Sequence, residues 1–199
     1  MTKVSIIIPY HKDRGYLNQA IESVKAQSYE CELILSHSNG TCAINLANGL
    51  DKVQTEFYAV LAEDDWLSVD FAKRMLEKIG DADLCYGYAW RHKGSGKPEL
   101  WRSSYSGLND LLNGTRIHGG AVLYRTESVR RVGGYERALE TAEEYDLHLR
   151  MSKENCKFVE SDFPHYHYLM HEENKSVKSG RFKRERNEYI NQVIRNRYR

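Results

Sequence analysis

Three consecutive carboxylates, Glu63, Asp64 and Asp65, follow directly after an apolar segment at residues 57–62. Such a run predicts a buried strand, and the acidic residues then fall at its carboxyl end, where ligands bind in open α/β sheets. Adjacent carboxylates repel one another, but Mg²⁺ or Mn²⁺ takes oxygen ligands and often keeps positions open for substrate phosphates. The alternative is a solvated turn before a helix that Asp65 or Ser68 caps.

A second acidic pair, Glu143 and Glu144, lies further along the chain. Carboxylates of this kind could take a proton from a reacting hydroxyl group. However, Thr141 and Glu144 also fit a T-x-x-E capping box at the start of a helix predicted at 142–152. The residues alone favour capping over catalysis.

The elements that would position these residues alternate between strand and helix in the first part of the chain. The expected strands lie at 4–9, 31–36 and 57–62, and the expected helices at 16–27, 42–50 and 71–79. This alternation predicts a largely parallel sheet covered by helices. The second part is less regular, with strands expected at 83–90 and 121–124, a loop or hairpin at 91–98, and helices at 128–132 and 142–152.

Length and composition favour one soluble domain. The chain has 199 residues, with 41% hydrophobic and 29% charged residues. Its apolar stretches fall short of the ~20 residues that a membrane span needs, and the N-terminus shows no signal peptide. The four cysteines are widely spaced and form no CxxC pair, so we expect reduced thiols in a cytoplasmic protein rather than a zinc site or disulfide scaffold.

The charge is unevenly distributed. Residues 1–174 hold 20 basic and 26 acidic residues, a net −6, whereas residues 175–199 hold 9 basic and 2 acidic residues, a net +7. A basic tail on an acidic body suggests an anionic partner, either a membrane surface that the protein binds peripherally or a nucleic acid such as DNA. The alternative is a solvated helix face.

Four segments stand in a characteristic order: residues 4–29, 57–67, 120–135 and 143–150. In this order they resemble the family 2 glycosyltransferases, which have the GT-A fold, over residues 3–176. The resemblance implies an α/β, Rossmann-like domain with a mixed, mostly parallel sheet flanked by helices. It places a GT-A catalytic domain at 1–176 and a basic C-terminal helix or tail at 177–199.

The resemblance also assigns the acidic triplet. It implies that Asp64 binds Mn²⁺ or Mg²⁺, that Glu63 faces the ribose or a metal-bound water, and that Asp65 is a further metal candidate. His171 lies in a segment that is similar to the one after the family's last core strand, where a histidine can reach the metal or the diphosphate. Ala62 departs from the family, because an aspartate is common at this position.

For the nucleotide-sugar donor, the resemblance places Pro9 and Tyr10 beside the base, with Glu63 and Asp64 as further donor-binding residues. His37 is a further donor-binding candidate, in the turn at 36–40. Most family members carry at this turn an aspartate that recognises uracil, and this chain has none. UDP is the first choice of nucleotide, and dTDP and GDP stay open.

The family's acidic base motif maps onto Glu143 and Glu144, and this alignment favours Glu144 as the catalytic base, with Glu143 as an orienting residue. The implied reaction is inverting transfer of a sugar to a hydroxyl group of a glycan or lipid-linked glycan, in a pocket bordered by residues 91–101 and 117–120. Three alternatives stay open: transfer to a hydroxylated DNA base, which would have to flip out of the duplex, a nucleotidyltransferase, and a non-catalytic nucleotide-sugar binder. The oligomeric state is not predicted.

Overall fold

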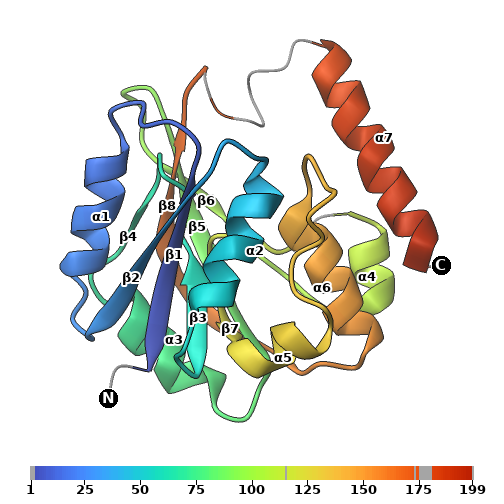
Figure 1. Cartoon of the computed structure of the whole chain (residues 1–199), viewed down its shortest axis with the longest axis horizontal. Helices are drawn as coiled ribbons and strands as arrows, with labels where there is room; N and C mark the ends of the chain where they lie inside the picture. Colours follow the sequence, from blue (N-terminus) through green and yellow to red (C-terminus); the bar gives the residue numbers. More distant parts are fainter. Residues whose placement is uncertain (1–2, 115, 173, 175–180, 199) are drawn as a thin grey trace.

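The computed structural model describes residues 3–114, 116–172, 174 and 181–198, and it shows a curled sheet with helices on both faces (Figure 1). The predicted boundary between residues 176 and 177 lies outside the described residues. In chain order the elements are β1 (Val4–Tyr10), α1 (Leu17–Lys25), β2 (Cys31–His37), α2 (Cys42–Lys52), β3 (Phe57–Val60), β4 (Trp66–Leu67), α3 (Phe71–Ile79), β5 (Leu84–Lys93), β6 (Glu99–Trp101), α4 (Leu108–Leu112), β7 (Val122–Arg125), α5 (Thr126–Arg131), α6 (Glu143–Lys153), β8 (Phe158–Met170) and α7 (Arg181–Tyr198).

The strands follow the order β2-β1-β3-β7-β5-β8-β4, and β6 pairs with β5. The predicted parallel part is the group β2-β1-β3. β7 runs antiparallel to both β3 and β5, whereas β5 and β8 pair in parallel. The sheet is therefore mixed, as expected, and its antiparallel pairs come from the less regular second part of the chain.

Two apolar cores lie on the two faces of the sheet. Along β1, Ile7 belongs to the core that contains residues of α2 and α6, whereas Val4, Ile6 and Ile8 belong to the core that contains residues of α1 and α3. Successive side chains of a strand point to opposite faces, so an uninterrupted apolar strand serves both cores. Because β1 pairs in parallel with both β2 and β3, the carboxyl ends of these three strands lie at one edge of the sheet.

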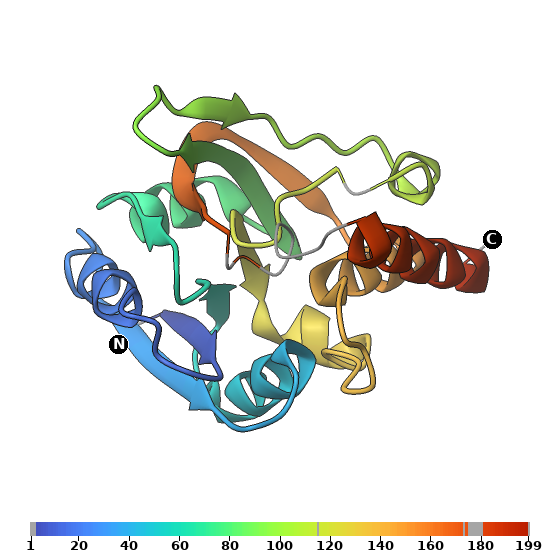
Figure 2. The same ribbon diagram turned by 90° about the horizontal axis from the view of Figure 1, so that it is seen from above.

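The described part of the basic tail is the helix α7, which lies beside α6 (Figure 2). Ile194 is buried in the core, and the hydroxyl group of Tyr198 donates a hydrogen bond to Asp146 Oδ1 at 2.8 Å. The C-terminal half of α7 is thus anchored to the domain. Within the described residues, no helix combines the length and the apolar character that crossing a bilayer requires, and the four cysteines form no disulfide.

Candidate active site

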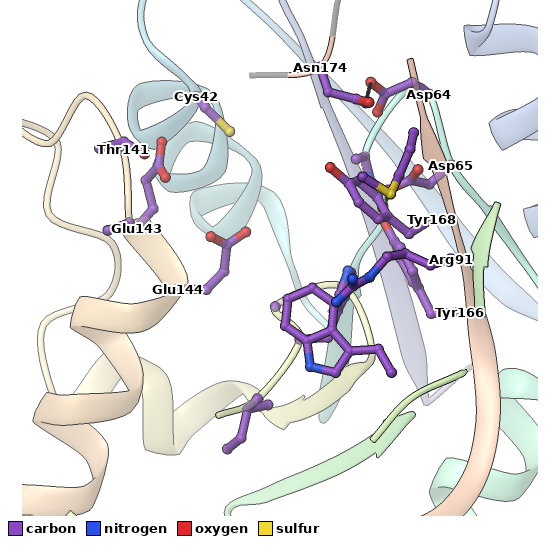
Figure 3. A pocket seen from close by; sticks show the side chains of 18 residues that line it. Cys42, Asp64, Asp65, Arg91, Thr141, Glu143, Glu144, Tyr166, Tyr168 and Asn174 are labelled. Atoms are coloured by element: carbon purple, nitrogen blue, oxygen red, sulfur yellow. Dashed lines mark hydrogen bonds between the residues drawn. The ribbon is translucent and has the colours of Figure 1, made fainter. Parts of the chain in front are cut away.

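A cavity of about 530 Å³ lies among the turn after β3, the β5–β6 hairpin, β8 and the start of α6. Asp64 and Asp65 line one end, and Glu143 and Glu144 line the other (Figure 3). The turn after β3 carries the first pair, and the first turn of α6 carries the second. The fold therefore brings together the two acidic segments that the sequence singled out.

Glu63 is paired with a cation that sequence reasoning missed. Arg14, in the loop after β1, donates from Nε to Glu63 Oε1 at 2.8 Å, and its Nη2 lies 2.6 Å from the same oxygen. Arg14 Nη2 also lies 3.5 Å from Asp64 Oδ2. Burial raises the pKa of Glu63, an effect that Arg14 opposes. The other oxygen, Glu63 Oε2, is buried and has no hydrogen-bond partner among the described residues.

Asp64 meets the predicted histidine. Its Oδ2 lies 3.0 Å from His171 Nε2, and the same oxygen accepts a hydrogen bond from Asn174 Nδ2 at 3.1 Å. Asn174, which sequence reasoning also missed, accepts a hydrogen bond from the His171 amide at 2.5 Å. Asn174 therefore fixes the chain after β8 so that His171 faces Asp64.

Asp65 points away from this pair and into the protein. Its Oδ2 accepts a hydrogen bond from the Tyr166 hydroxyl at 2.5 Å, and its Oδ1 accepts one from the Leu169 amide at 2.8 Å. The residue is only 2% exposed, and burial, together with the neighbouring charge of Asp64, raises its pKa well above the usual range. Asp65 thus ties the acidic turn to β8.

The donor set fits a divalent cation that shares its coordination with a substrate. Asp64 offers a carboxylate oxygen and His171 an imidazole nitrogen, and a cation with so few protein ligands completes its shell with water and phosphate oxygens. Among the described residues, no group of three or more His, Cys, Asp or Glu is arranged to hold a metal. A metal at Asp64 and His171 stays a prediction, and so does its extension to Asp65.

The predicted capping box at the start of α6 is wrong. The N-cap is Ala142, in the left-handed conformation (φ 65°, ψ 29°), and no side chain caps the helix. Thr141 therefore lies one residue too early to cap it, and Glu144 is the second residue of the helix. A left-handed non-glycine residue costs about 1–2 kcal/mol, a strain of the kind that gathers at functional sites. In Figure 3 the Glu144 side chain points toward the hollow.

Two glycines shape the wall beside Glu144. A Cβ atom on Gly119 would lie 2.8 Å from Cγ of Glu144, so only glycine leaves room for the present position of this side chain. A Cβ atom on Gly120 would lie 2.3 Å from the ring of Tyr166, the residue that holds Asp65. The two neighbouring glycines therefore accommodate one residue from each end of the cavity.

The predicted donor-base residues lie together at the carboxyl ends of β1 and β2. Pro9 is in register with Ser36, and Tyr10 with His37. The rings of Tyr10 and His37 have centroids 4.7 Å apart, and the Tyr10 carbonyl accepts a hydrogen bond from Asn45 Nδ2 at 3.0 Å. This group belongs to the same sheet edge as the acidic turn, although it does not line the cavity in the described part of the chain. Its role in binding a base stays a prediction.

The segments expected to border the acceptor do line the cavity, through Arg91, Trp101 and residues 117–120. Tyr105, which follows the β5–β6 hairpin, packs against Phe158 with ring centroids 4.2 Å apart. The wall of the cavity where we expect the acceptor is built by the β5–β6 hairpin and the segment before β7.

No protein-family model matches the chain. In sequence it is 26% identical over 183 residues to an uncharacterized glycosyltransferase of Rickettsia felis, and 27% identical over 185 residues to an uncharacterized glycosyltransferase, RC0461, of Rickettsia conorii. These alignments cover 72% and 73% of this chain and 30% of each relative. The chain thus spans less than a third of the length of these two relatives.

Solved structures show the same fold. Residues 1–349 of Staphylococcus aureus TarS, in complex with UDP-GlcNAc, match with a TM-score of 0.72 at 16% identity, over 89% of this chain and 61% of that one. The mannosyltransferase PcManGT of Pyrobaculum calidifontis, in complex with GDP-Man and Mn²⁺, matches with a TM-score of 0.63 at 12% identity, over 92% and 60%. These likenesses confirm the GT-A fold and the resemblance to glycosyltransferases that the sequence motifs indicated.

Proposed function

We propose that the chain carries the catalytic domain of a metal-dependent inverting glycosyltransferase. Its substrates would be a nucleotide-sugar, with a UDP-sugar as the first choice, and a hydroxyl group on a glycan or lipid-linked glycan. One observation carries the proposal: a single cavity has Asp64 at one end and Glu144 at the other. The nucleotide-sugar complexes of TarS and PcManGT, the second with Mn²⁺, support the choice of donor class.

At the first end, the residues suit the leaving diphosphate. A Mn²⁺ or Mg²⁺ ion bound at Asp64 and His171 would act as a Lewis acid toward the leaving group. Arg14 adds a fixed positive charge beside the same carboxylate. The buried, unpartnered Glu63 Oε2 is suited to accept a hydrogen bond from a ribose hydroxyl, in agreement with the role expected from the resemblance.

At the second end, Glu144 is proposed to take the proton of the acceptor hydroxyl while that oxygen attacks the sugar. In an inverting displacement the attacking oxygen and the leaving group lie on opposite sides of the reacting carbon. A base and a diphosphate site at opposite ends of one cavity suit this geometry. Glu143, almost fully buried at the helix start, is proposed to orient Glu144 or the acceptor.

The test is release of nucleoside diphosphate from a panel of nucleotide-sugars, measured with Mn²⁺, with Mg²⁺ and with EDTA. We expect at least one donor to be hydrolysed slowly without an acceptor, in a metal-dependent reaction that Asp64→Asn abolishes. If no donor is bound or hydrolysed and Asp64→Asn changes nothing, the proposal fails. Release of pyrophosphate from a nucleoside triphosphate would instead support a nucleotidyltransferase.

We propose that the basic segment at 177–199 assists binding to an anionic partner, with a membrane surface as the first choice and DNA as the second. Arg195 and Arg197 lie in the part of α7 that Ile194 and Tyr198 anchor to the domain. Deletion of residues 181–199 should weaken binding to anionic liposomes or to DNA in a salt-dependent way. Equal binding of the full and shortened chains would contradict this role.

A further inference from the structure

Arg91 is a cation in the cavity wall that no carboxylate of the described residues neutralises. It lies on β5, where it is in register with Glu99 of β6, and Trp101 is in register with Ala89. Arg91 and Trp101 are therefore diagonal neighbours on one face of the hairpin. The guanidinium carbon lies 4.6 Å from the Trp101 ring centroid. Among the described residues, the side chain of Arg91 forms no ion pair or hydrogen bond, not even with that of Glu99.

The other charged side chains that line the cavity in the described part of the chain are carboxylates. Arg91 is the sole lysine or arginine among the described residues that line it, whereas the carboxylates are those of Asp64, Asp65, Glu143 and Glu144. His118, the histidine on the same wall, stays neutral, because burial and then the charge of Arg91 lower its pKa to about 4. Arg91 therefore supplies the positive charge of the acceptor side at neutral pH.

The contact with Trp101 also leaves the N–H donors of the Arg91 side chain available to a ligand. The contact with the indole ring is made through the guanidinium carbon, and the N–H groups around that carbon form a planar fork that matches the two oxygens of a carboxylate or phosphate. The aromatic surface limits the motion of the long side chain, so less conformational entropy is lost when an anion binds. In Figure 3 the Arg91 and Glu144 side chains extend toward the same hollow from opposite walls.

We propose that Arg91, supported by Trp101, is an acceptor-binding residue that selects a glycan carrying an anionic group, a carboxylate or a phosphate, close to the reacting hydroxyl. This inference rests on the proposed function and names the substrate class of the same site. The carboxylate of Glu144 repels an anion and accepts a hydrogen bond from a hydroxyl group, whereas the guanidinium group of Arg91 attracts the anion. The two side chains together orient the acceptor with its hydroxyl toward the base.

The experiment measures binding of the full chain to three matched sets of oligosaccharides: uronic-acid-containing glycans, phosphorylated glycans and their neutral counterparts. We expect the wild-type protein to bind one of the two anionic sets about 10- to 100-fold more tightly than its neutral counterparts. This is the range that one charged hydrogen-bonding pair gives. The set that is preferred identifies the anion as carboxylate or phosphate.

Two arginine-to-methionine variants distinguish anion binding by Arg91 from a role in which its side chain only packs on an aromatic ring. Arg91→Met should bring anionic and neutral glycans to equal affinity. Arg102→Met is the matched control, because Arg102 stacks on Tyr88 at 5.2 Å and does not line the cavity. It should keep the wild-type preference. The proposal is overturned if the wild-type protein binds no anionic glycan or prefers neutral ones, or if Arg91→Met keeps the preference.

A parallel titration with UDP-GlcNAc and GDP-mannose in the presence of Mn²⁺ distinguishes a failure of the acceptor inference from a failure of the proposed function. We expect donor affinity to be the same in the wild-type protein and in Arg91→Met. Donor binding without selectivity for anionic glycans would refute the acceptor inference alone. Absence of binding to any nucleotide-sugar would refute the proposed function, whatever the glycans show.

Discussion

The two acidic segments of the cavity look alike in sequence and differ in construction. At the turn after β3, three adjacent carboxylates differ in their nearest partners: Glu63 pairs with Arg14, Asp64 meets His171, and Asp65 is held by Tyr166. Successive side chains of the turn point in different directions. At the start of α6, by contrast, the position of Glu144 depends on a left-handed backbone at Ala142 and on the missing side chain of Gly119.

The difference shows that a run of carboxylates is not by itself a metal site. Repulsion within the triplet is relieved by Arg14 on one side and by the buried hydrogen bonds of Asp65 on the other. Only Asp64 is placed to share a cation with His171. The second segment is defined by shape instead, because the helix start and the glycine wall aim the Glu144 carboxylate into the cavity.

The base assignment gives the largest expected effect. Glu144→Gln keeps the shape of the side chain and removes its ability to take a proton, so kcat for transfer should fall about 10²- to 10⁴-fold. The affinity for the nucleotide-sugar should not change, because the residue is at the other end of the cavity. Glu143→Gln is the matched control, with a smaller loss. A larger loss in Glu143→Gln would exchange the roles of the two residues.

Within the triplet, neighbouring Asp→Asn changes should give different results. Asp64→Asn should lower kcat about 10²- to 10³-fold, comparable to the loss of one group that stabilises transition-state charge, and raise the Mn²⁺ concentration needed for half-maximal activity. Asp65→Asn replaces one of the two acceptor oxygens, which serve the Tyr166 hydroxyl and the Leu169 amide, with an NH₂ group, and should instead lower the free energy of unfolding by about 1–3 kcal/mol. If Asp65→Asn shifts the Mn²⁺ dependence as strongly as Asp64→Asn, Asp65 is a metal ligand.

Substitutions of Gly119 and Gly120 distinguish an effect on the position of Glu144 from an effect on the stability of the fold. In Gly119→Ala the new methyl group displaces the flexible Glu144 side chain, and a shift of this size can cost up to about 100-fold in kcat. In Gly120→Ala it meets the buried ring of Tyr166, which has no room to move, and unfolding in urea should show a loss of about 1–3 kcal/mol. A Gly119→Ala enzyme with unchanged kcat would show that the observed position of Glu144 is not required.

Periodicity predicted most of the first part of the fold, because strands buried on both faces and amphipathic helices leave strong local patterns. β4 and α4, at Trp66–Leu67 and Leu108–Leu112, were not predicted, since elements so short have no period to detect. The capping box at Thr141 failed for another reason. A left-handed residue at Ala142 follows from the packing around Glu144 and Gly119, which a local motif does not contain.

The acidic residues of the site could be predicted, but their partners could not. Arg14 and Asn174 lie 49 and 110 residues away in sequence from the carboxylates that they contact. The position of Arg14 in the sequence could have indicated its contact with Glu63. A basic residue in the loop after the first strand is expected at the same sheet edge as the acidic triplet. The side chain of Asn174 resembles any other polar residue near a strand end, and only the folded chain shows what it holds.

The smallest expected effect concerns the helix that carries the base. His148, one turn after Glu144 on α6, is 1% exposed, and its Nε2 lies 2.8 Å from the Tyr124 hydroxyl. Burial lowers its pKa to about 3, from 6.5. Between these two values the unfolded chain binds a proton that the folded chain does not. Stability is therefore full above pH 6.5 and falls by about 1.4 kcal/mol per pH unit below it.

At pH 5 this histidine should cost the wild-type protein about 2 kcal/mol relative to pH 7. His148→Gln keeps a partner for Tyr124 and removes the titration, so its loss between pH 7 and pH 5 should be smaller by that amount in urea unfolding. The other buried histidines remain in both proteins and cancel in the comparison. Equal pH dependence of the two proteins would show that folding does not lower the pKa of His148, and that its burial on α6 does not exclude the proton.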